Sequence, residues 1–508
     1  MKKFIKFVTS SKFLLALTFL INVAVFVCFT LFLDTYIYTL ISLFAGLILI
    51  GFLNADNENT DYKIIWIITI ILLPVFGTAL YIQLKTTRGS KRQRKRFQNI
   101  SYLSYKALEQ NNEVVDTLTK YDAGAANYSK YLLNTEKWPV YNDTTVNYLK
   151  DGETYFDDMF DAIKNAKKYI LLEYFIVKPG KIWKQLFDLL RLKSREGVEI
   201  KLLYDDFGCV DRFDDKKFFK KLVNHGIEAV PFNKIVPTVN MFSQYRDHRK
   251  IVVIDGCIGY VGGINVGDEY ANEDNKFGYW KDTAVKINGS AVWSLVVMFF
   301  NNWQVSTKKI IDITKYKNDR IVSTKVKDYV QPYGTGPITK SPIARNLFDK
   351  MISGARKTIY ITTPYFIIDR TIMQDLKVAA LSGVDIKIIM PGIPDKKWVF
   401  YLSRSYYSEL IKVGVKIYEY SPGFVHAKMM VVDDTTTVVG STNFDFRSLY
   451  LHFESGVLIH NSKMVSTVKQ DMDNIIGNSH LVTLRDMKQR KCYEKFAGAF
   501  LKFFAPFM

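Results

Sequence analysis

The stretch His248-Arg-Lys-Ile-Val-Val-Ile-Asp255 decides the interpretation of this chain, because it recurs as His426-Ala-Lys-Met-Met-Val-Val-Asp433. Each copy joins a histidine, a lysine and an aspartate through an apolar run that contains β-branched residues. Such a run predicts a β-strand, and residues two apart on a strand point to the same side. The sequence therefore predicts two strands, one carrying His248 and Lys250 on a single face and the other carrying His426 and Lys428.

The sequence around the two motifs also repeats. Ala162–Ile170 resembles Met351–Ile359, and Gly197–Leu203 resembles Gly383–Ile389. These matches recur after about 190 positions, which indicates a duplicated domain. Helical and β-rich segments alternate within each copy, a pattern typical of an α/β fold. We expect two α/β repeats that form a unit with pseudo-twofold symmetry.

Each motif is followed by small residues and an asparagine. The segments are Gly262-Gly-Ile-Asn265 and Gly440-Ser-Thr-Asn443, and each asparagine lies fifteen positions after the lysine of its motif. Small residues let the backbone approach a ligand closely. We therefore expect the substrate to be bound by Gly263, Asn265, Ser441 and Asn443.

Two imidazoles, two ammonium groups and two amides suit the transfer of a phosphodiester. The lysines and asparagines offset negative charge on the phosphate oxygens, while one imidazole attacks phosphorus and the other protonates the departing alkoxide. Neither motif contains a carboxylate cluster suited to Mg²⁺, so we expect no metal and no cofactor. Asp255 and Asp433 end their strands, and we expect them to brace the motifs rather than to touch substrate.

A single H-x-K is a weak signal, because a lone histidine beside a strand is more often structural. Two copies in two repeats, each with the same downstream asparagine, make the catalytic interpretation much stronger. The remaining histidines lie outside any pattern, and we expect them to be structural or surface residues: His225, His452, His460 and His480.

Composition points to a polyanionic partner. The chain has 508 residues and a formal charge of +19, which suits either nucleic acid or an anionic bilayer. The four cysteines lie far apart and form no C-x-x-C pair, so neither a zinc site nor a disulfide framework is indicated.

Three apolar stretches favour the bilayer. Phe13–Leu33, Tyr36–Leu53 and Ile64–Leu84 each approach the roughly 20 residues that cross a membrane as a helix. Lysines precede the first stretch and a basic run ending at Arg96 follows the last, so the positive-inside rule places both flanks in the cytoplasm. An even number of crossings follows, with one of the first two stretches re-entrant or interfacial; three full crossings are the alternative.

The carboxy-terminal segment Lys488–Met508 mixes basic and aromatic residues. It suits either a position in the membrane interface or packing on the second repeat, and the sequence leaves both open.

At the motif residues the chain resembles the phospholipase D superfamily and, more narrowly, the bacterial cardiolipin synthases. The resemblance rests on Tyr245–Gly256, Gly262–Tyr270, Trp280–Thr283, Thr363–Phe366 and Asn443–Ser448. The last apolar stretch also resembles the membrane segment of this family, at Pro74, Gly77 and Tyr81.

The resemblance implies transfer of a phosphatidyl group from one phosphatidylglycerol to another, which gives cardiolipin and glycerol through a phosphohistidine. It implies His248 as nucleophile and His426 as acid and then base, although the near symmetry of the repeats leaves the reverse open. It also implies that Asp282 and Glu454 orient the histidines.

We expect four segments: a membrane anchor (1–96), a helical linker (97–136), a first repeat (137–325), and a second repeat with an amphipathic end (326–508). The predicted protein is a multi-pass enzyme of the cell membrane, with its catalytic domain in the cytoplasm. Its predicted partners are phosphatidylglycerol and anionic membrane lipids, not nucleic acid. The sequence does not indicate an oligomeric state.

Other functions also fit parts of the pattern. One is a phospholipase D that hydrolyses lipid with water, and another is a synthase that uses phosphatidylethanolamine. A membrane-tethered nuclease would account for the positive charge, but the apolar stretches argue against it. Two intact motifs make a non-catalytic scaffold the weakest alternative.

Overall fold

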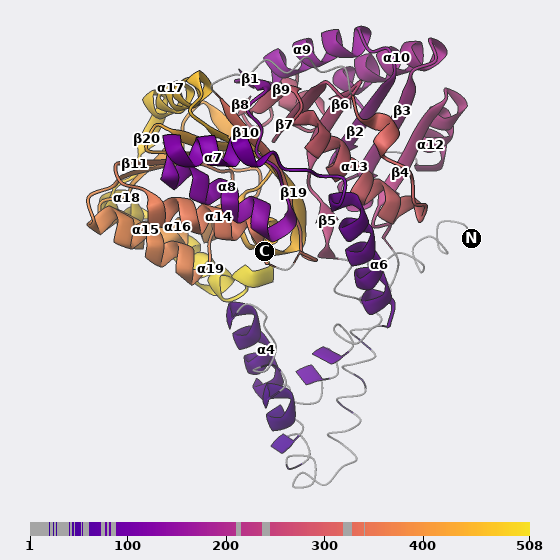
Figure 1. Ribbon diagram of the computed structural model, residues 1–508. Helices are drawn as coiled ribbons and strands as arrows, with labels where there is room; N and C mark the ends of the chain where they lie inside the picture. Colours follow the sequence, from indigo (N-terminus) through magenta and orange to yellow (C-terminus); the bar gives the residue numbers. More distant parts are fainter. Residues whose placement is uncertain are drawn as a thin grey trace. The chain divides into compact units, whose positions relative to one another are not determined.

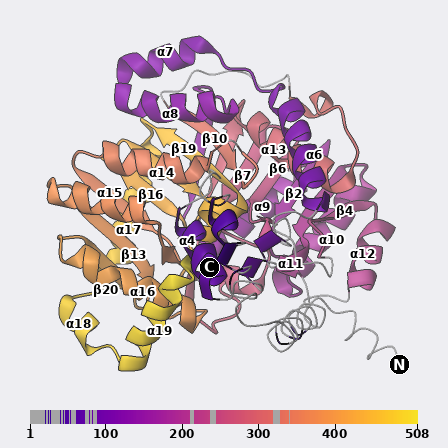
Figure 2. The ribbon, with the colours of Figure 1, turned by 90° about the horizontal axis from the view of Figure 1, so that it is seen from below.

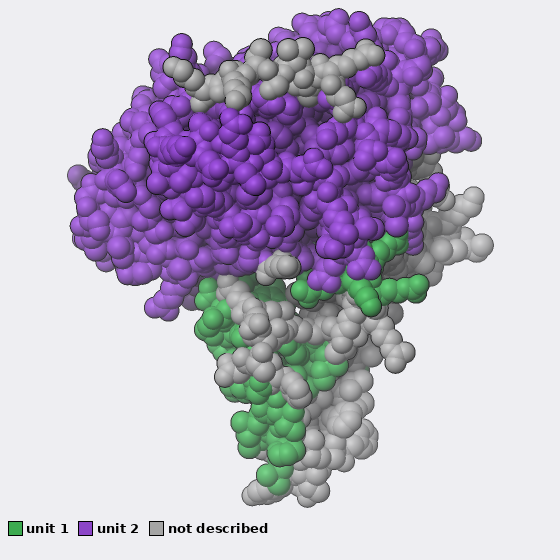
Figure 3. Space-filling model, viewed as in Figure 1, with its two compact units in different colours: residues 1–96, 234–245, 503–507 green, residues 97–233, 246–502, 508 purple. Residues whose placement is uncertain are grey.

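The computed structural model describes residues 60–72, 88–209, 215–235, 244–318, 328–339 and 341–507, and scattered positions between 20 and 82. The chain divides into two compact units (Figure 3). Unit 1 comprises residues 1–96, 234–245 and 503–507, and unit 2 comprises residues 97–233, 246–502 and 508.

Unit 1 contains helix α4 (Thr60–Leu72). Unit 1 contains a cluster of buried apolar side chains: Leu49, Leu53, Trp66, Ile70 and Tyr81. Among the described residues, no helix is both long enough and apolar enough to cross a bilayer. Most of the three predicted membrane stretches lie outside the described residues, so the predicted crossings stay a prediction.

Unit 2 contains two large sheets whose first seven strands follow equivalent orders, and the second sheet has β20 as an additional strand at the end. The first is β1 (Thr144–Leu149), β9 (Ala284–Gly289), β7 (Ile258–Gly262), β6 (Lys250–Ile254), β2 (Tyr169–Tyr174), β3 (Glu199–Asp205) and β4 (Ile227–Phe232). The second is β10 (Tyr329–Thr335), β19 (His452–His460), β17 (Thr436–Gly440), β16 (Met429–Val432), β11 (Thr358–Thr362), β13 (Asp385–Pro391), β14 (Lys416–Tyr420) and β20 (Ser479–Leu481).

The strand directions match as well. In each sheet the first five strands are antiparallel, and the next two join in parallel. The predicted pair of α/β repeats is therefore confirmed, and the motif strands β6 and β16 are each the fourth strand in the order of their sheets.

Helices surround both sheets (Figures 1 and 2). In the first repeat they are α9 (Gly152–Lys164), α10 (Lys181–Arg195), α11 (Asp206–Cys209), α12 (Asp215–Asn224) and α13 (Val292–Thr307). In the second they are α14 (Ile343–Gly354), α15 (Arg370–Leu381), α16 (Lys397–Ile411), α17 (Lys463–Gly477), α18 (Leu484–Gln489) and α19 (Cys492–Phe503). The residues before β1 form α6 (Arg88–Tyr105), α7 (Asn112–Tyr121) and α8 (Ala123–Glu136).

Helix α13 holds the two sheets together. Its residues from Val292 to Gln304 are all buried, as expected for a helix that is apolar on every side. It contacts β6 and β4 of the first sheet and β10 of the second. The hydrophobic core is therefore shared by the repeats.

Two short strands cross from one repeat to the other. β5 (Arg246–Asp247) pairs with β19 of the second repeat, and β15 (Gly423–Val425) pairs with β8 (Tyr279–Lys281) of the first. Each crossing strand leads directly into a motif histidine, so the two motifs are brought to the junction of the repeats.

The motif aspartates lie at the far ends of their strands. The Asp255 carboxylate accepts N–H groups from Lys167, Lys168 and Tyr169 at 2.7–2.9 Å, and Asp255 has a positive φ of 52°. Asp433 repeats this arrangement with a φ of 51° and accepts from the three residues Arg356, Lys357 and Thr358 at 2.7–3.0 Å. These are the contacts of a brace, because each aspartate joins the end of the motif strand to the start of its neighbour.

Replacing Asp255 with alanine should lower the free energy of unfolding by about 2 kcal/mol, because charge-assisted bonds to three backbone N–H groups are lost. Asp255→Asn should cost less, since asparagine tolerates positive φ and keeps one acceptor oxygen. Denaturant unfolding of the detergent-solubilised protein measures both changes. The specific activity of the folded Asp255→Asn protein should stay within a few-fold of the unmodified protein; a loss as large as that of a motif histidine would contradict a bracing role.

Candidate active site

Each motif histidine is held by the backbone of the opposite repeat. The His248 N–H donates to the carbonyl of Phe453 at 2.9 Å, and the His426 N–H donates to the carbonyl of Lys281 at 2.7 Å. Both acceptors directly precede a buried acidic residue, Glu454 or Asp282. The strand pairing at the junction therefore sets the position of each ring.

Each motif histidine bonds a carboxylate of the other repeat, and we call these two bonds the exchanged histidine–carboxylate pairs. His248 Nδ1 lies 2.9 Å from Glu454 Oε1, and His426 Nδ1 lies 2.5 Å from Asp282 Oδ2. In its ionised form a carboxylate can only accept, and it then holds the imidazole proton on Nδ1 and leaves Nε2 with a lone pair. The structure brings together all four residues, and each histidine depends on a carboxylate from the other half.

The residues after the motifs support these carboxylates. Ser441 Oγ donates to Glu454 Oε2 at 2.5 Å. At the equivalent place in the first repeat, any side chain on Gly263 would collide with the Asp282 carboxylate, which also accepts the Thr283 N–H at 2.8 Å. Gly263 and Ser441 thus each lie against a carboxylate that orients a histidine, and their direct contact with substrate stays a prediction.

The asparagines also have partners within the protein. Asn265 accepts the Ile176 N–H at 3.0 Å and donates to the Tyr270 hydroxyl at 2.7 Å. Asn443 donates to Asp445 Oδ2 at 2.9 Å. An amide nitrogen carries two hydrogens, so each asparagine retains a second N–H beyond the described bond, and substrate binding by these residues stays a prediction.

The motif lysines are buried beside the histidines. Lys250 Nζ donates to the His248 carbonyl and Lys428 Nζ to the His426 carbonyl. Both histidines and Lys428 precede the motif strands, because β6 begins at Lys250 and β16 begins at Met429. The expectation that one strand carries each His/Lys pair is therefore wrong, since each histidine lies in the short segment between a crossing strand and the motif strand. Burial lowers the pKa of Lys250 to about 7 and that of Lys428 to about 8. A bound phosphate would favour the protonated form of both lysines.

Burial and neighbouring cations also keep the imidazoles neutral. Burial, with Lys428 next, lowers the pKa of His426 to about 4, although Asp282 opposes the shift. Burial and Lys250 lower the pKa of His248 well below its ordinary value. A neutral imidazole is the form that can attack phosphorus.

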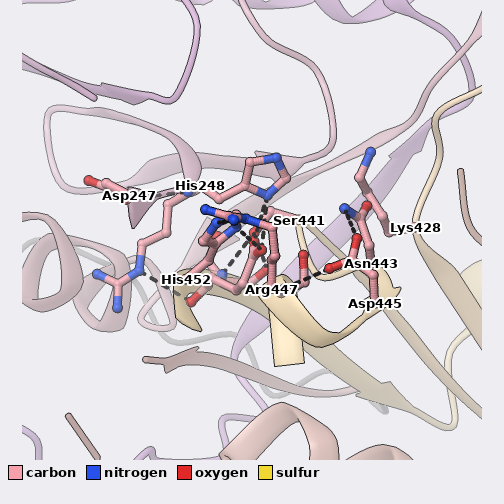
Figure 4. A network of polar contacts seen from close by, with 12 residues as sticks. Asp247, His248, Lys428, Ser441, Asn443, Asp445, Arg447 and His452 are labelled. Atoms are coloured by element: carbon pink, nitrogen blue, oxygen red, sulfur yellow. Dashed lines mark hydrogen bonds and ion pairs between the residues drawn. The ribbon is translucent and has the colours of Figure 1, made fainter. Parts of the chain in front are cut away.

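His452 is a site residue that the sequence pattern does not identify. Its ring centroid lies 5.6 Å from that of His248, and its Nε2 accepts from Arg447 Nε at 3.2 Å. Figure 4 shows His248, His452, Arg447 and Ser441 gathered together, beside Lys428 and Asn443. The expectation that His452 is structural or at the surface therefore misses its place beside His248. A comparison of the repeats contains the signal, because His452-Phe-Glu454 corresponds to Trp280-Lys-Asp282.

The two halves of the site differ in character. Aromatic rings surround His426, with centroids at 5.3 Å for Trp280, 5.5 Å for Tyr270 and 5.9 Å for Phe424. In the described part of the chain, His248 has one such neighbour, Phe175 at 5.0 Å, together with His452 and its cationic partner Arg447. The two repeats therefore share a strand arrangement but place different side chains around their motif histidines.

Three of these groups have a spacing that a divalent ion can use. Ligand atoms of His248, His452 and Glu454 lie within 4.8 Å of one another, and imidazole with carboxylate suits zinc. Two of the three are already bonded to each other in the histidine–carboxylate pair. The expected metal-free chemistry stays a prediction.

Comparison with known proteins agrees with this geometry. Residues 159–289 and 348–476 match the family model described as "Cardiolipin synthase, PLD-like domain". The chain is 33% identical to a cardiolipin synthase of Halalkalibacterium halodurans, over 89% of this chain and 90% of the relative. It is 34% identical to cardiolipin synthase 2 of Bacillus anthracis, over 89% and 88%.

A solved structure shares the fold. The phosphatidylserine synthase of Haemophilus influenzae superposes with a TM-score of 0.58 at 15% identity, over 76% of this chain and 98% of that one. The family model and both relatives span the two repeats and both motifs. The chain belongs to the cardiolipin synthase family, whose catalytic domains are of the phospholipase D type.

Proposed function

We propose that this chain is a phosphatidyltransferase that converts two phosphatidylglycerols into cardiolipin and glycerol. The exchanged histidine–carboxylate pairs carry the proposal, because they supply two oriented imidazoles with reactive Nε2 atoms at one junction. Membership of the cardiolipin synthase family supports the choice of lipid. The proposed partners are phosphatidylglycerol and other anionic membrane lipids.

In the first step His248 Nε2 attacks the phosphorus of phosphatidylglycerol. The bond from phosphorus to the glycerol oxygen breaks, and that oxygen receives a proton from His426, which must therefore be protonated when the substrate is bound. The phosphatidyl group remains on His248, and free glycerol leaves.

In the second step neutral His426 takes the proton from the terminal hydroxyl of another phosphatidylglycerol. The oxygen attacks phosphorus, the bond to His248 Nε2 breaks, and cardiolipin forms. One histidine thus serves as acid and then as base, as microscopic reversibility requires. Lys250 and Lys428 offset charge on the phosphate oxygens in both steps.

Glu454 and Asp282 stabilise the charge that develops on the rings. The positive charge on His248 in the phosphohistidine is adjacent to the Glu454 carboxylate, and protonated His426 is adjacent to Asp282. Substrate-binding roles for Gly263, Asn265, Ser441 and Asn443 belong to the same proposal.

We propose the segment boundaries expected from the sequence: an anchor over 1–96, a helical segment over 97–136, and repeats over 137–325 and 326–508. The anchor makes the enzyme a multi-pass protein of the cell membrane, and the basic flanks place the catalytic repeats in the cytoplasm. Hydrolysis by water is a second possible fate of the phosphohistidine, with phosphatidic acid as its product.

The central test uses purified protein, phosphatidylglycerol labelled in the acyl chains, and chelator to remove metal ions. Cardiolipin and glycerol should form in equal amounts. His248→Ala and His426→Ala should each reduce transfer by more than about 10³-fold while circular dichroism stays unchanged, since each ring has its own role. Phosphatidic acid as the main product would identify a hydrolase, and cleavage of oligonucleotides without lipid turnover would identify a nuclease.

A phosphohistidine is hydrolysed in acid. The reaction should therefore be quenched in alkali, and peptide mapping should then locate the label. His426→Ala should accumulate label on His248 from a substrate with a good leaving group, because attack needs no proton donor there and the base for resolution is missing. Label on His426 would reverse the proposed roles.

The KM for phosphatidylglycerol should rise as the pH increases from 7 to 9. Both lysines have lowered pKa values, about 7 for Lys250 and about 8 for Lys428, so the free site loses positive charge over this range. Lys428→Arg keeps its charge at these pH values and should reduce the rise. A KM that is independent of pH in the unmodified enzyme would contradict the importance of these ammonium groups.

A further inference from the structure

Helices α16 and α19 expose an unusual number of large aromatic side chains. The exposed fraction is 63% for Trp398, 57% for Tyr493, 74% for Phe496 and 56% for Phe500. We call these four residues the aromatic face. Exposed apolar residues gathered in this way mark a surface for binding a partner or a membrane.

The aromatic face is held on a firm support. A side chain on Gly498 would lie 2.6 Å from the carbonyl oxygen of Tyr401, so α19 approaches α16 closely there, and Arg490 donates to the same carbonyl at 3.3 Å. Tyr493, Phe496 and Phe500 follow the i, i+3, i+7 spacing of a single helix face. That face is opposite Gly498, so packing on α16 directs the three rings outward.

Ring contacts connect the two helices. Trp398 lies 6.2 Å from Tyr401, and Tyr401 lies 6.1 Å from Tyr493, between ring centroids. The rings of Phe496 and Phe500 are stacked at 6.4 Å. Figure 2 shows α19 beside α16, with α18 next to it.

Basic residues accompany the aromatic face. Lys396, Lys397, Lys491 and Lys495 are exposed, and Lys491 Nζ lies 5.9 Å from the centre of the Tyr493 ring. Aromatic rings at the acyl boundary together with lysines at the headgroups are typical of a membrane interface. The positive charge suits an anionic bilayer, which would also be the source of the proposed substrate.

The chain beyond α19 gives an independent reason to choose a bilayer. Four residues after α19 ends, Phe507 lies in unit 1 at 5.2 Å from Tyr62 and 6.4 Å from Trp66, between ring centroids. Both partners lie on α4, and Trp66 falls within the predicted membrane stretch Ile64–Leu84. The end of α19 is thus tied by a short segment to the part of the chain expected to enter the membrane.

We propose that the aromatic face inserts into the interface of an anionic bilayer, with its rings at the acyl boundary and the adjacent lysines at the lipid phosphates. This docking seats the catalytic unit on the membrane that holds its substrate. It goes beyond the proposed transfer reaction and uses that reaction only to identify the lipid.

Trp398 provides a direct probe. The chain has seven tryptophans, all of them described, and the other six are at most 9% exposed. Full-length protein is reconstituted in phosphatidylcholine vesicles containing phosphatidylglycerol brominated near the carboxyl end of its acyl chains. Bromine-dependent quenching should be about twofold smaller in Trp398→Phe than in the unmodified protein, because interfacial rings lie at that depth. Equal quenching in the two proteins would overturn the proposal.

A second measurement does not depend on Trp398. The double variant Phe496→Ser, Phe500→Ser should turn over vesicle phosphatidylglycerol about tenfold more slowly, through lost apolar burial, and should act normally on monomeric short-chain phosphatidylglycerol. Leu381→Ser on α15, where the leucine is 72% exposed, is the matched control and should change neither rate. Equal loss on both substrates, or a smaller particle mass in detergent that reveals an interface between copies, would overturn the proposal.

The transfer reaction and the membrane docking can be refuted independently of each other. If unmodified protein does not convert short-chain phosphatidylglycerol, the transfer reaction is wrong, whereas the quenching difference still tests the docking.

Discussion

The hydrogen bond from each motif histidine to a carboxylate of the other repeat is the constraint on which the site depends. Glu454 orients His248 and Asp282 orients His426, so neither repeat holds a complete histidine–carboxylate pair. The backbone repeats the exchange, since β5 pairs with β19 and β15 pairs with β8. Displacement of one repeat relative to the other would break both pairs, and the central helix α13 and the shared core resist such displacement.

Burial gives the exchanged pairs their strength and sets the charge of the site. Ionic groups removed from water interact strongly, but they carry a desolvation cost. Burial raises the pKa of Glu454 to about 8, while it lowers the pKa of Lys250 to about 7. A phosphodiester between the two lysines would supply the negative charge that stabilises their protonated forms. The buried lysines therefore suit a site that binds an anion.

Features that depend on local sequence could be predicted, and features that depend on contact between the repeats could not. The β-branched runs predict the motif strands β6 and β16, although His248, His426 and Lys428 precede those strands. The strand-end positions of Asp255 and Asp433 predict braces. The exchange of carboxylates requires knowledge of how two domains meet, and no spacing within one repeat contains it. The position of His452 was not predicted for the same reason. It lies beside His248 because β19 pairs with β5 of the other repeat. Ser441 and Gly263 follow motifs of the same H-x-K-x4-D pattern. Ser441 nevertheless bonds the Glu454 carboxylate, whereas Gly263 leaves room for the Asp282 carboxylate.

The difference between the two halves of the site suits a transfer in which two successive displacements take place at the same phosphorus atom. In-line displacement puts the departing and incoming oxygens opposite the nucleophile. With His248 as nucleophile, both glycerol groups approach from the side of His426, where Trp280, Tyr270 and Phe424 offer aromatic faces to carbon-bound hydrogens. In that assignment the lipid phosphate is bonded to His248, on the side where Arg447 and Lys250 supply positive charge. A duplicated domain thus becomes an enzyme with two unlike ends through changes at a few positions, of which His452 in place of Trp280 is the clearest.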